Sequence, residues 1–308
     1  MKLGKAFLGA LLLGGITSLP ELTTTIVVSY LGNAPLAVSN LLGGISMQTV
    51  VLAMADLFLL KKALTYVSPQ PILIMGGVLL IFQLAFVIIC IALGEFISFY
   101  NIGLWSLLNC ALYILFVFVL KKYEGQRRWI PTDFPASLNE RKKYKKVDFS
   151  KYSIPKLWLR IILHAMPVVV GGVIISFSAN SLVHATGMSS TFVGASIVAV
   201  TTSLPEITTT FYAITLGAYT LAISNIFGSN ALMIGLLLVS DIFYRKGLIF
   251  NSLSNSALFV SALGILVTAT YLWGLLERRN KTLFRMGFDS IVVIMIEVIG
   301  LTAIYFLE

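Results

Sequence analysis

The segment Thr17-Ser18-Leu19-Pro20-Glu21 occurs a second time, 185 positions later, as Thr202-Ser203-Leu204-Pro205-Glu206. Around it, residues 7–58 align without a gap with residues 192–243, and 21 of these 52 positions are identical. A shared composition alone does not place proline, glutamate and asparagine in register over such a length. The chain therefore contains one unit twice, and this repeat constrains the architecture before any single motif does.

The composition is typical of a membrane protein and excludes a soluble one. Hydrophobic residues make up 58% of the 308 positions, charged residues only 11%, and the mean hydropathy is +0.94. A bilayer-spanning helix needs about 20 apolar residues, and the apolar runs lack the two-residue alternation of a membrane barrel. We predict an all-α polytopic membrane protein with nine spans, at residues 6–30, 36–60, 71–93, 102–120, 157–180, 190–216, 221–243, 255–276 and 288–307.

The basic residues lie mainly in the connections between these spans. The formal charge is +9, and the largest hydrophilic segment, 121–156, holds eleven basic and four acidic residues. An excess of Lys and Arg marks cytoplasmic connections, so we interpret the charge as a topology signal and not as a nucleic-acid site. We predict that 121–156 is a basic cytoplasmic loop. It separates a first membrane repeat, 1–120, which contains 7–58, from a second repeat, 157–308, which contains 192–243.

The two repeats are predicted to be inverted. The first span corresponds to the sixth, and an odd offset of five spans means that the copies enter the membrane from opposite sides. Inverted repeats with broken helices are typical of secondary transporters, whose substrate sites lie near the midplane between the repeats. The span at 157–180 has no partner in the first copy. We therefore expect a ten-span fold whose first helix precedes Met1, with a nine-span fold as the alternative.

The duplicated motif places polar groups in the middle of a span. Proline removes a backbone donor and frees the carbonyl four residues before it, and Glu21 shares a helix face with Thr17 and Ser18. A carboxylate at this depth costs roughly 2.5 to 3.5 kcal/mol, so two of them need compensation by a bound cation or by protonation. Ligands that are all oxygen favour a hard ion, Ca²⁺ before Mg²⁺.

The helix after each motif carries small and amide side chains at spacings that place most of them on one face. They are Asn40, Gly43, Gly44 and Gln48 in the first copy, and Asn225, Gly228, Ser229 and Asn230 in the second. For Gly43 and Gly228, close helix packing and a place at an ion site are equally good interpretations.

Three further acids lie in or beside the spans. Asp56 and Asp241 are at equivalent helix ends and are expected to pair with the neighbouring Lys and Arg side chains. Glu297, well inside the last span, is not duplicated, but an intramembrane acid is a functional candidate.

The paired Thr-Ser-Leu-Pro-Glu segments, each followed at fixed spacing by a helix with Gly-Ser-Asn or its remnant, resemble the alpha repeats of the calcium/cation antiporter superfamily, which includes the sodium/calcium exchangers. The resemblance covers 7–58 and 192–243. It implies ten helices in two inverted units, and two glutamates that bind calcium and exchange it for sodium or protons. The ligands it implies are the carboxylates of Glu21 and Glu206, the hydroxyls of Ser18 and Ser203, and the carbonyls of Thr17 and Thr202.

This chain departs from the family pattern in the helix after the motif. Where the family usually has Gly-Ser, the first copy has Gly43-Gly44, while Ser229 keeps the hydroxyl in the second copy. Gln48 can still coordinate a cation, but its equivalent Met233 offers no oxygen, and sodium coupling is the property most affected. The predicted site also includes four further side chains: Asn40, Gln48, Asn225 and Ser229.

These observations predict a secondary active cation antiporter that exports calcium in exchange for sodium or protons by alternating access. The alternative is a non-transporting membrane scaffold that keeps the exchanger fold. No nucleophile–base pair or cofactor motif points to an enzyme, and no cofactor is expected. The expected partners are the lipid bilayer and inorganic cations, and the predicted location is the cell (plasma) membrane.

Overall fold

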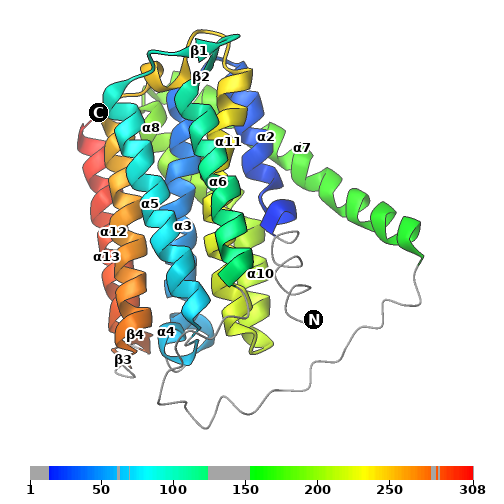
Figure 1. Cartoon of the computed structure of the whole chain (residues 1–308), viewed down its shortest axis with the longest axis vertical. Coiled ribbons are helices and arrows are strands. Elements are labelled where there is room, and N and C mark those ends of the chain that lie inside the picture. The colour runs from blue at the N-terminus through cyan, green and yellow to red at the C-terminus, as the bar shows by residue number, and fades with distance from the viewer. Residues whose placement is uncertain are drawn as a thin grey trace.

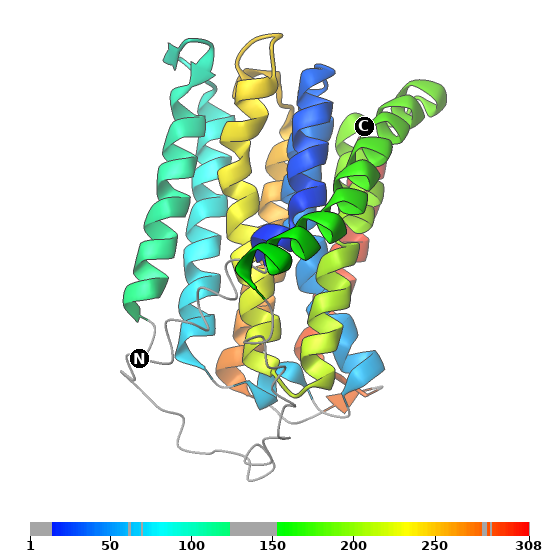
Figure 2. The same cartoon turned by 90° about the vertical axis from the view of Figure 1, so that its right-hand side faces the viewer.

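The computed structural model describes residues 14–60, 63–68, 70–123, 153–278, 282–283 and 285–307, with the backbone alone at 154, 157 and 158. This part of the chain is a bundle of long helices (Figure 1, Figure 2). Seven of its helices are long and apolar enough to cross a membrane, and one bent pair of shorter helices makes an eighth such span. The predicted all-α polytopic membrane protein is confirmed.

The elements follow the predicted spans closely. The first half contains a helical turn at 14–17 and then α2 (Leu19–Tyr30), α3 (Ala34–Leu59), α4 (Leu64–Val67), α5 (Pro71–Leu93), β1 (Ser98–Phe99), β2 (Ile102–Gly103) and α6 (Leu104–Tyr123). The second half contains α7 (Ile154–Thr186), α8 (Ser190–Val193), the π-helix η3 (Gly194–Val198), α9 (Ala199–Thr202), α10 (Leu204–Thr215), α11 (Tyr219–Phe243), the 3₁₀ turn η4 (Ile249–Ser252), α12 (Asn255–Glu277), β3 (Thr282–Leu283), β4 (Met286–Gly287) and α13 (Phe288–Leu307).

Some predictions differ from these boundaries or fall outside the described residues. The helix predicted at 157–180 is longer, because α7 continues to Thr186. The short elements α4 and η4 and the two β-hairpins were not predicted, since two- to four-residue elements leave almost no periodic signal. The predicted span 6–30 is described only from residue 14, and the predicted loop 121–156 is described only at its two ends.

The equivalent helices α3 and α11 run in opposite directions through the bundle (Figure 1). At the end of α3, Asp56 Oδ2 accepts a hydrogen bond from the Gly287 N–H of the β3–β4 hairpin (3.1 Å). At the end of α11, Asp241 Oδ2 accepts one from the Gly103 N–H of the β1–β2 hairpin (2.7 Å). The two hairpins lie at opposite ends of the molecule, as the inverted topology requires.

Each duplicated motif interrupts a helix at the residue before its Leu-Pro. Ser18 has φ −82° and ψ 13°, and Ser203 has φ −79° and ψ 3°, so the two backbones deviate from helical geometry in the same way. In the second copy the segments 190–202 and 204–215 meet at 46°. Proline explains the break, because it occupies the second position of α2 and of α10, where its missing N–H has no helical partner to lose.

The most buried spans are the two central helices. Of the most apolar 18-residue stretch, 78% is buried in α3 and 67% in α11, against 17% in α6 and 11% in the described part of α7. A helix that is apolar all round belongs inside a bundle or in lipid, and α3 and α11 take the inside positions. The small and amide side chains that follow each motif, which we call the polar stripe of that repeat, therefore lie on the two helices at the centre of the bundle.

Candidate cation site

Glu21 and Glu206 occupy equivalent places in the first turns of α2 and α10, and both side chains are 0% exposed. They belong to different repeats, and the hydroxyl of Ser18, three residues before Glu21, lies 3.3 Å from Glu206 Oε1. Both α2 and α10 pack against α3 and α11. The structure thus brings the two motif glutamates together beside both polar stripes.

The Glu206 carboxylate is held by hydroxyls from both repeats. Ser18 Oγ and Ser229 Oγ each lie 3.3 Å from Glu206 Oε1, and the two hydroxyls are 2.7 Å apart. Ser18 comes from the break before α2 and Ser229 from α11. In the described part of the chain, Glu206 Oε2 has no hydrogen-bond partner.

The Glu21 carboxylate lacks such a frame. Thr202 and Gln48 face it, but neither Glu21 oxygen receives a hydrogen bond from the described residues. The position equivalent to Ser229 is Gly44, where an added Cβ atom would lie 3.1 Å from both Cε and Sδ of Met233. A thioether therefore packs where the second copy has a hydroxyl.

The asparagines of the two polar stripes are also buried, and several of their polar atoms have no partner among the described residues. Thr202 Oγ1 lies 3.3 Å from Asn40 Oδ1, while Asn40 Nδ2 and both polar atoms of Asn225 have no partner among the described residues. Asn230, which was noted only as part of the stripe, donates from Nδ2 to the Ile45 carbonyl of α3 (3.2 Å). Positions 45 and 230 are themselves equivalent, so this bond joins the two central helices where the repeats meet.

The predicted ligand atoms of Thr17 and Thr202 are their backbone carbonyls, and their hydroxyls have other contacts. Thr17 Oγ1 donates to the Gly14 carbonyl (3.1 Å), and Thr202 Oγ1 lies 3.0 Å from the Val198 carbonyl in addition to its contact with Asn40. The Ser203 hydroxyl is buried and has no partner in the described chain.

Many of the unpartnered buried polar atoms in the described part of the chain belong to this site. They include atoms of Glu21, Asn40, Gln48, Ser203, Glu206, Asn225 and Asn230. Buried polar groups are almost always hydrogen-bonded, and a group without a partner calls for an explanation such as an ion or ordered water. The atoms left over are mainly carboxylate, amide and hydroxyl groups, whose oxygens suit a hard cation.

A π-helix precedes the second break and was not predicted. It packs against α3 so closely that a Cβ on Gly43 would lie 2.4 Å from Ala195 Cα, whereas a Cβ on Gly228, the equivalent of Gly43, would meet nothing within 4 Å. Of the two interpretations of these glycines, close packing therefore applies to Gly43, and open space surrounds Gly228. The glycines at 43 and 194 were the available sequence signal for this contact, because glycine lets two backbones approach closely. A π-bulge of this kind often occurs at a functional site.

Backbone N–H groups are the main described partners of Asp56 and Asp241, and both aspartates are buried. Asp56 accepts the N–H groups of Leu64 and Gly287 and the Ser290 hydroxyl, while its predicted partners at 61 and 62 lie outside the described residues. Asp241 accepts the N–H groups of Gly103 and Ile249. Within the described residues no ion pair joins Asp241 to Arg245 or Lys246, so the pairing predicted for Asp241 is wrong.

The sequence model of the family described as sodium/calcium exchanger protein matches residues 1–122 and 156–305. The chain belongs to this family. The superfamily predicted from the two motifs is thereby confirmed, and a multi-pass membrane protein of the transporter class follows. A comparison with curated protein sequences finds no match.

Three solved structures of other proteins have a fold similar to that of this chain. The sodium-calcium exchanger NCX_Mj is 19% identical, with a TM-score of 0.60 over 97% of this chain and 86% of that chain. Native YfkE is 15% identical, with a TM-score of 0.64 over 99% and 87%. The H⁺/Ca²⁺ exchanger CAX is 13% identical, with a TM-score of 0.60 over 99% and 84%. At these identities the likeness concerns the fold.

Proposed function

We propose that this chain is a secondary active antiporter of the plasma membrane that exports calcium in exchange for sodium or protons. Glu21 and Glu206 are its main ligands, one from each repeat. The hydroxyls of Ser18, Ser203 and Ser229, the carbonyls of Thr17 and Thr202, and the amides complete an oxygen-rich sphere. Membership of the exchanger family and the folds of a sodium-calcium and an H⁺/Ca²⁺ exchanger support this assignment.

One observation carries the proposal: two fully buried carboxylates, one from each repeat, lie among polar atoms that have no partner in the described part of the chain. Isolated buried charges are strongly disfavoured unless they are paired or coordinate a metal. Ca²⁺ takes six to eight oxygen ligands in flexible geometry, which suits a mixture of carboxylate, hydroxyl, carbonyl and amide groups. A divalent cation neutralises both glutamates at once.

Exchange follows from the same electrostatics. When calcium leaves, the two carboxylates again repel each other, so the carrier must take up sodium ions or protons before it reorients. Only the occupied forms then move between the two sides at low cost, which is the condition for antiport. Gly44 and Met233 reduce the number of oxygens near Glu21, and this bears on how many sodium ions the site accepts.

The test is calcium flux into proteoliposomes driven by an outward sodium gradient or, separately, by a pH gradient. Glu21→Ala and Glu206→Ala should each lower the flux to that of protein-free vesicles. Glu277→Gln, which removes a carboxylate at the end of α12, should leave it unchanged. Unchanged transport by both alanine variants would refute the site.

The scaffold alternative makes a different prediction in the same material. A scaffold shows neither saturable calcium binding nor a calcium-dependent rise in its unfolding temperature, whereas a transporter that binds calcium in its folded state must show both. Wild-type protein without either response would favour the scaffold.

A further inference from the structure

Glu297 is a buried carboxyl group that the two-glutamate site does not use. It lies in the middle of α13 and is 3% exposed. The equivalent region of α6 has Leu112 and Tyr113, and the equivalent of its partner Ser46 is Ala231. Both members of the Glu297–Ser46 contact are therefore absent from the other repeat, so the contact is not a remnant of the duplication.

The Ser46 hydroxyl has two acceptor contacts, and both cannot be hydrogen bonds if Glu297 is ionised. Ser46 Oγ lies 2.9 Å from the Gly43 carbonyl oxygen and 3.0 Å from Glu297 Oε1. A serine hydroxyl has a single proton to donate, and a carbonyl oxygen has none. If the hydroxyl donates to Gly43, the contact with Glu297 is a hydrogen bond only when the carboxyl group supplies the proton.

The surroundings of Glu297 also favour the protonated form of its carboxyl group. Ser46 is the one hydrogen-bond partner of Glu297 in the described part of the chain, and Glu297 Oε2 has none there. A charged side chain at this depth needs pairing or water, while a neutral carboxyl group with one bond to a hydroxyl costs far less.

We propose that Glu297 is a proton-binding site separate from the two-glutamate site, with its proton donated to Ser46 Oγ and the Ser46 proton donated to the Gly43 carbonyl. Ser46 is two residues from Gln48 on α3 and so points to the opposite side of that helix. The proton is taken up from water and returned to water, and no other group changes. When it leaves, the Ser46 hydroxyl turns to the carboxylate and releases the Gly43 carbonyl.

Gly43 connects this site to the second copy of the motif. Its backbone packs directly against Ala195 in η3, which continues through α9 to Thr202 and Ser203. A change in the hydrogen bonding of the Gly43 carbonyl therefore acts at a close backbone contact between α3 and the broken helix. This inference concerns proton binding and holds whichever cation is transported.

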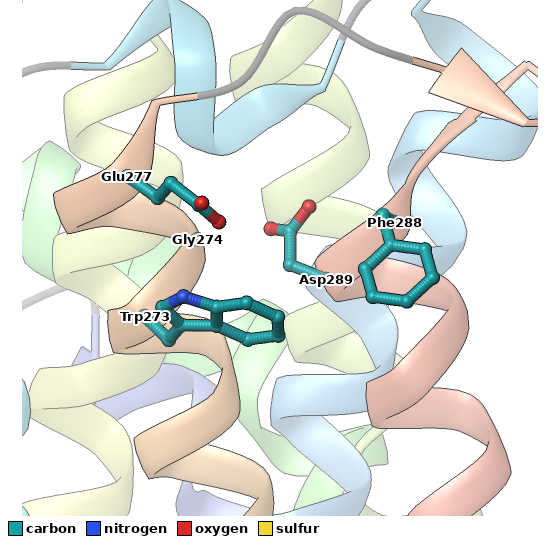
Figure 3. Close-up of a pocket in the computed structure, with 5 residues that line it drawn as sticks. All are labelled: Trp273, Gly274, Glu277, Phe288 and Asp289. Atoms are coloured by element: carbon teal, nitrogen blue, oxygen red, sulfur yellow. The ribbon is translucent and has the colours of Figure 1, made fainter.

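The other titratable groups near α13 lie toward its two ends. Elements packed against it contribute Asp56 from α3 and Tyr271 and Glu277 from α12, and α13 itself carries Asp289 near its start and Tyr305 near its end. The Glu277 and Asp289 carboxylates face each other across a pocket between the ends of α12 and α13 (Figure 3). Asp289 is eight residues, about 12 Å of helix, from Glu297. None of these groups is changed by substitution of Glu297, so the difference between the two spectra isolates its signal.

Infrared spectroscopy of the full chain in lipid nanodiscs tests the proposal through the carbonyl stretch of protonated carboxylic acids. The background is Glu21→Gln with Glu206→Gln, so that the motif glutamates contribute nothing and transport is not needed. At neutral pH, adding Glu297→Gln should remove one carboxylic-acid band. Ser46→Ala should keep this band but shift it to higher frequency, because the acid loses its acceptor.

The control is Ser261→Ala, since this buried α12 hydroxyl donates to the Ala257 carbonyl of its own helix (2.9 Å). It should leave the band in place. Identical acid bands with and without Glu297→Gln would overturn the proposal. Should the Glu297→Gln protein fail to fold, Ser46→Ala decides: a shifted band supports the site, and an unshifted spectrum overturns it.

Discussion

The two repeats are alike at their ends and different at the centre. At the ends, Asp56 and Asp241 each accept the N–H of a residue eight positions later and the N–H of a hairpin glycine. At the centre, Ser229 holds Glu206 together with Ser18, whereas the equivalent Gly44 is covered by Met233.

The ends and the centre of the duplicated unit differ because they have different structural roles. The ends fix the turn that joins neighbouring helices, and buried backbone donors there need the same acceptor in both copies. The centre forms one shared site, so the copies can contribute unequal ligand sets as long as their sum neutralises the charge. Glu206 has a preorganised environment, and Glu21 depends on what enters the site.

The largest expected effect tests the part that is alike. Asp56→Ala leaves two backbone N–H groups and one hydroxyl without their acceptor, and Asp241→Ala leaves two N–H groups. Because each unsatisfied buried group costs about 1 to 3 kcal/mol, we expect losses of at least about 3 and about 2 kcal/mol in the free energy of unfolding. Equilibrium unfolding in mixed micelles measures both.

Ser290→Ala is the control for that pair, because it removes only the hydroxyl partner of Asp56. It should cost about 1 kcal/mol. If Asp241→Ala leaves stability unchanged while Asp56→Ala does not, the ends of the two copies are not equivalent.

A second comparison uses the glycines after the motif. Gly43→Ala places a methyl group 2.4 Å from a backbone atom of Ala195, which should destabilise the protein by about 1 to 3 kcal/mol. Gly228→Ala enters open space and should change stability by less than about 0.5 kcal/mol. The same unfolding assay applies, and equal losses in the two variants would contradict the asymmetric packing.

The sequence predicted the fold because membrane helices are long and uniformly apolar. The apolar runs at 71–93 and 288–307 match α5 and α13 at both ends. The repeat at a spacing of 185 residues predicted the inversion of the two halves from the sequence alone. The hairpins were missed because two-residue strands have no periodicity. The π-helix was missed because Gly194–Val198 differs from an α-helix only in its hydrogen-bond register.

For the candidate site, the sequence identified residue types and not partners. Duplication singled out Glu21 and Glu206, whose roles stay predictions. It could not reveal that Ser18 crosses to Ser229 of the other repeat, because contacts 211 positions apart depend on packing. The partners of Asp241 were mispredicted for the same reason: Gly103 is adjacent only in the folded bundle.

The smallest expected effect addresses the part that differs. Ser229→Ala removes one of the two hydroxyls on Glu206 and should weaken calcium binding about tenfold, or about 1.4 kcal/mol, as measured by isothermal titration calorimetry. Ser224→Ala is the matched control on α11, because the Ser224 hydroxyl donates to the Leu221 carbonyl of its own helix (3.2 Å). It should leave the affinity unchanged.

The converse variant makes the copies equal. Gly44→Ser gives the first copy the hydroxyl of Ser229, and Met233→Gln gives the second copy the amide of Gln48 in a volume close to that of methionine. Both changes add oxygen atoms to the site in which Glu21 lacks a described hydrogen-bond donor, so calcium should bind about tenfold more tightly. An unchanged affinity in this variant, together with a weakened one in Ser229→Ala, would mean that the Glu206 half alone sets the affinity and that Glu21 acts only through its charge.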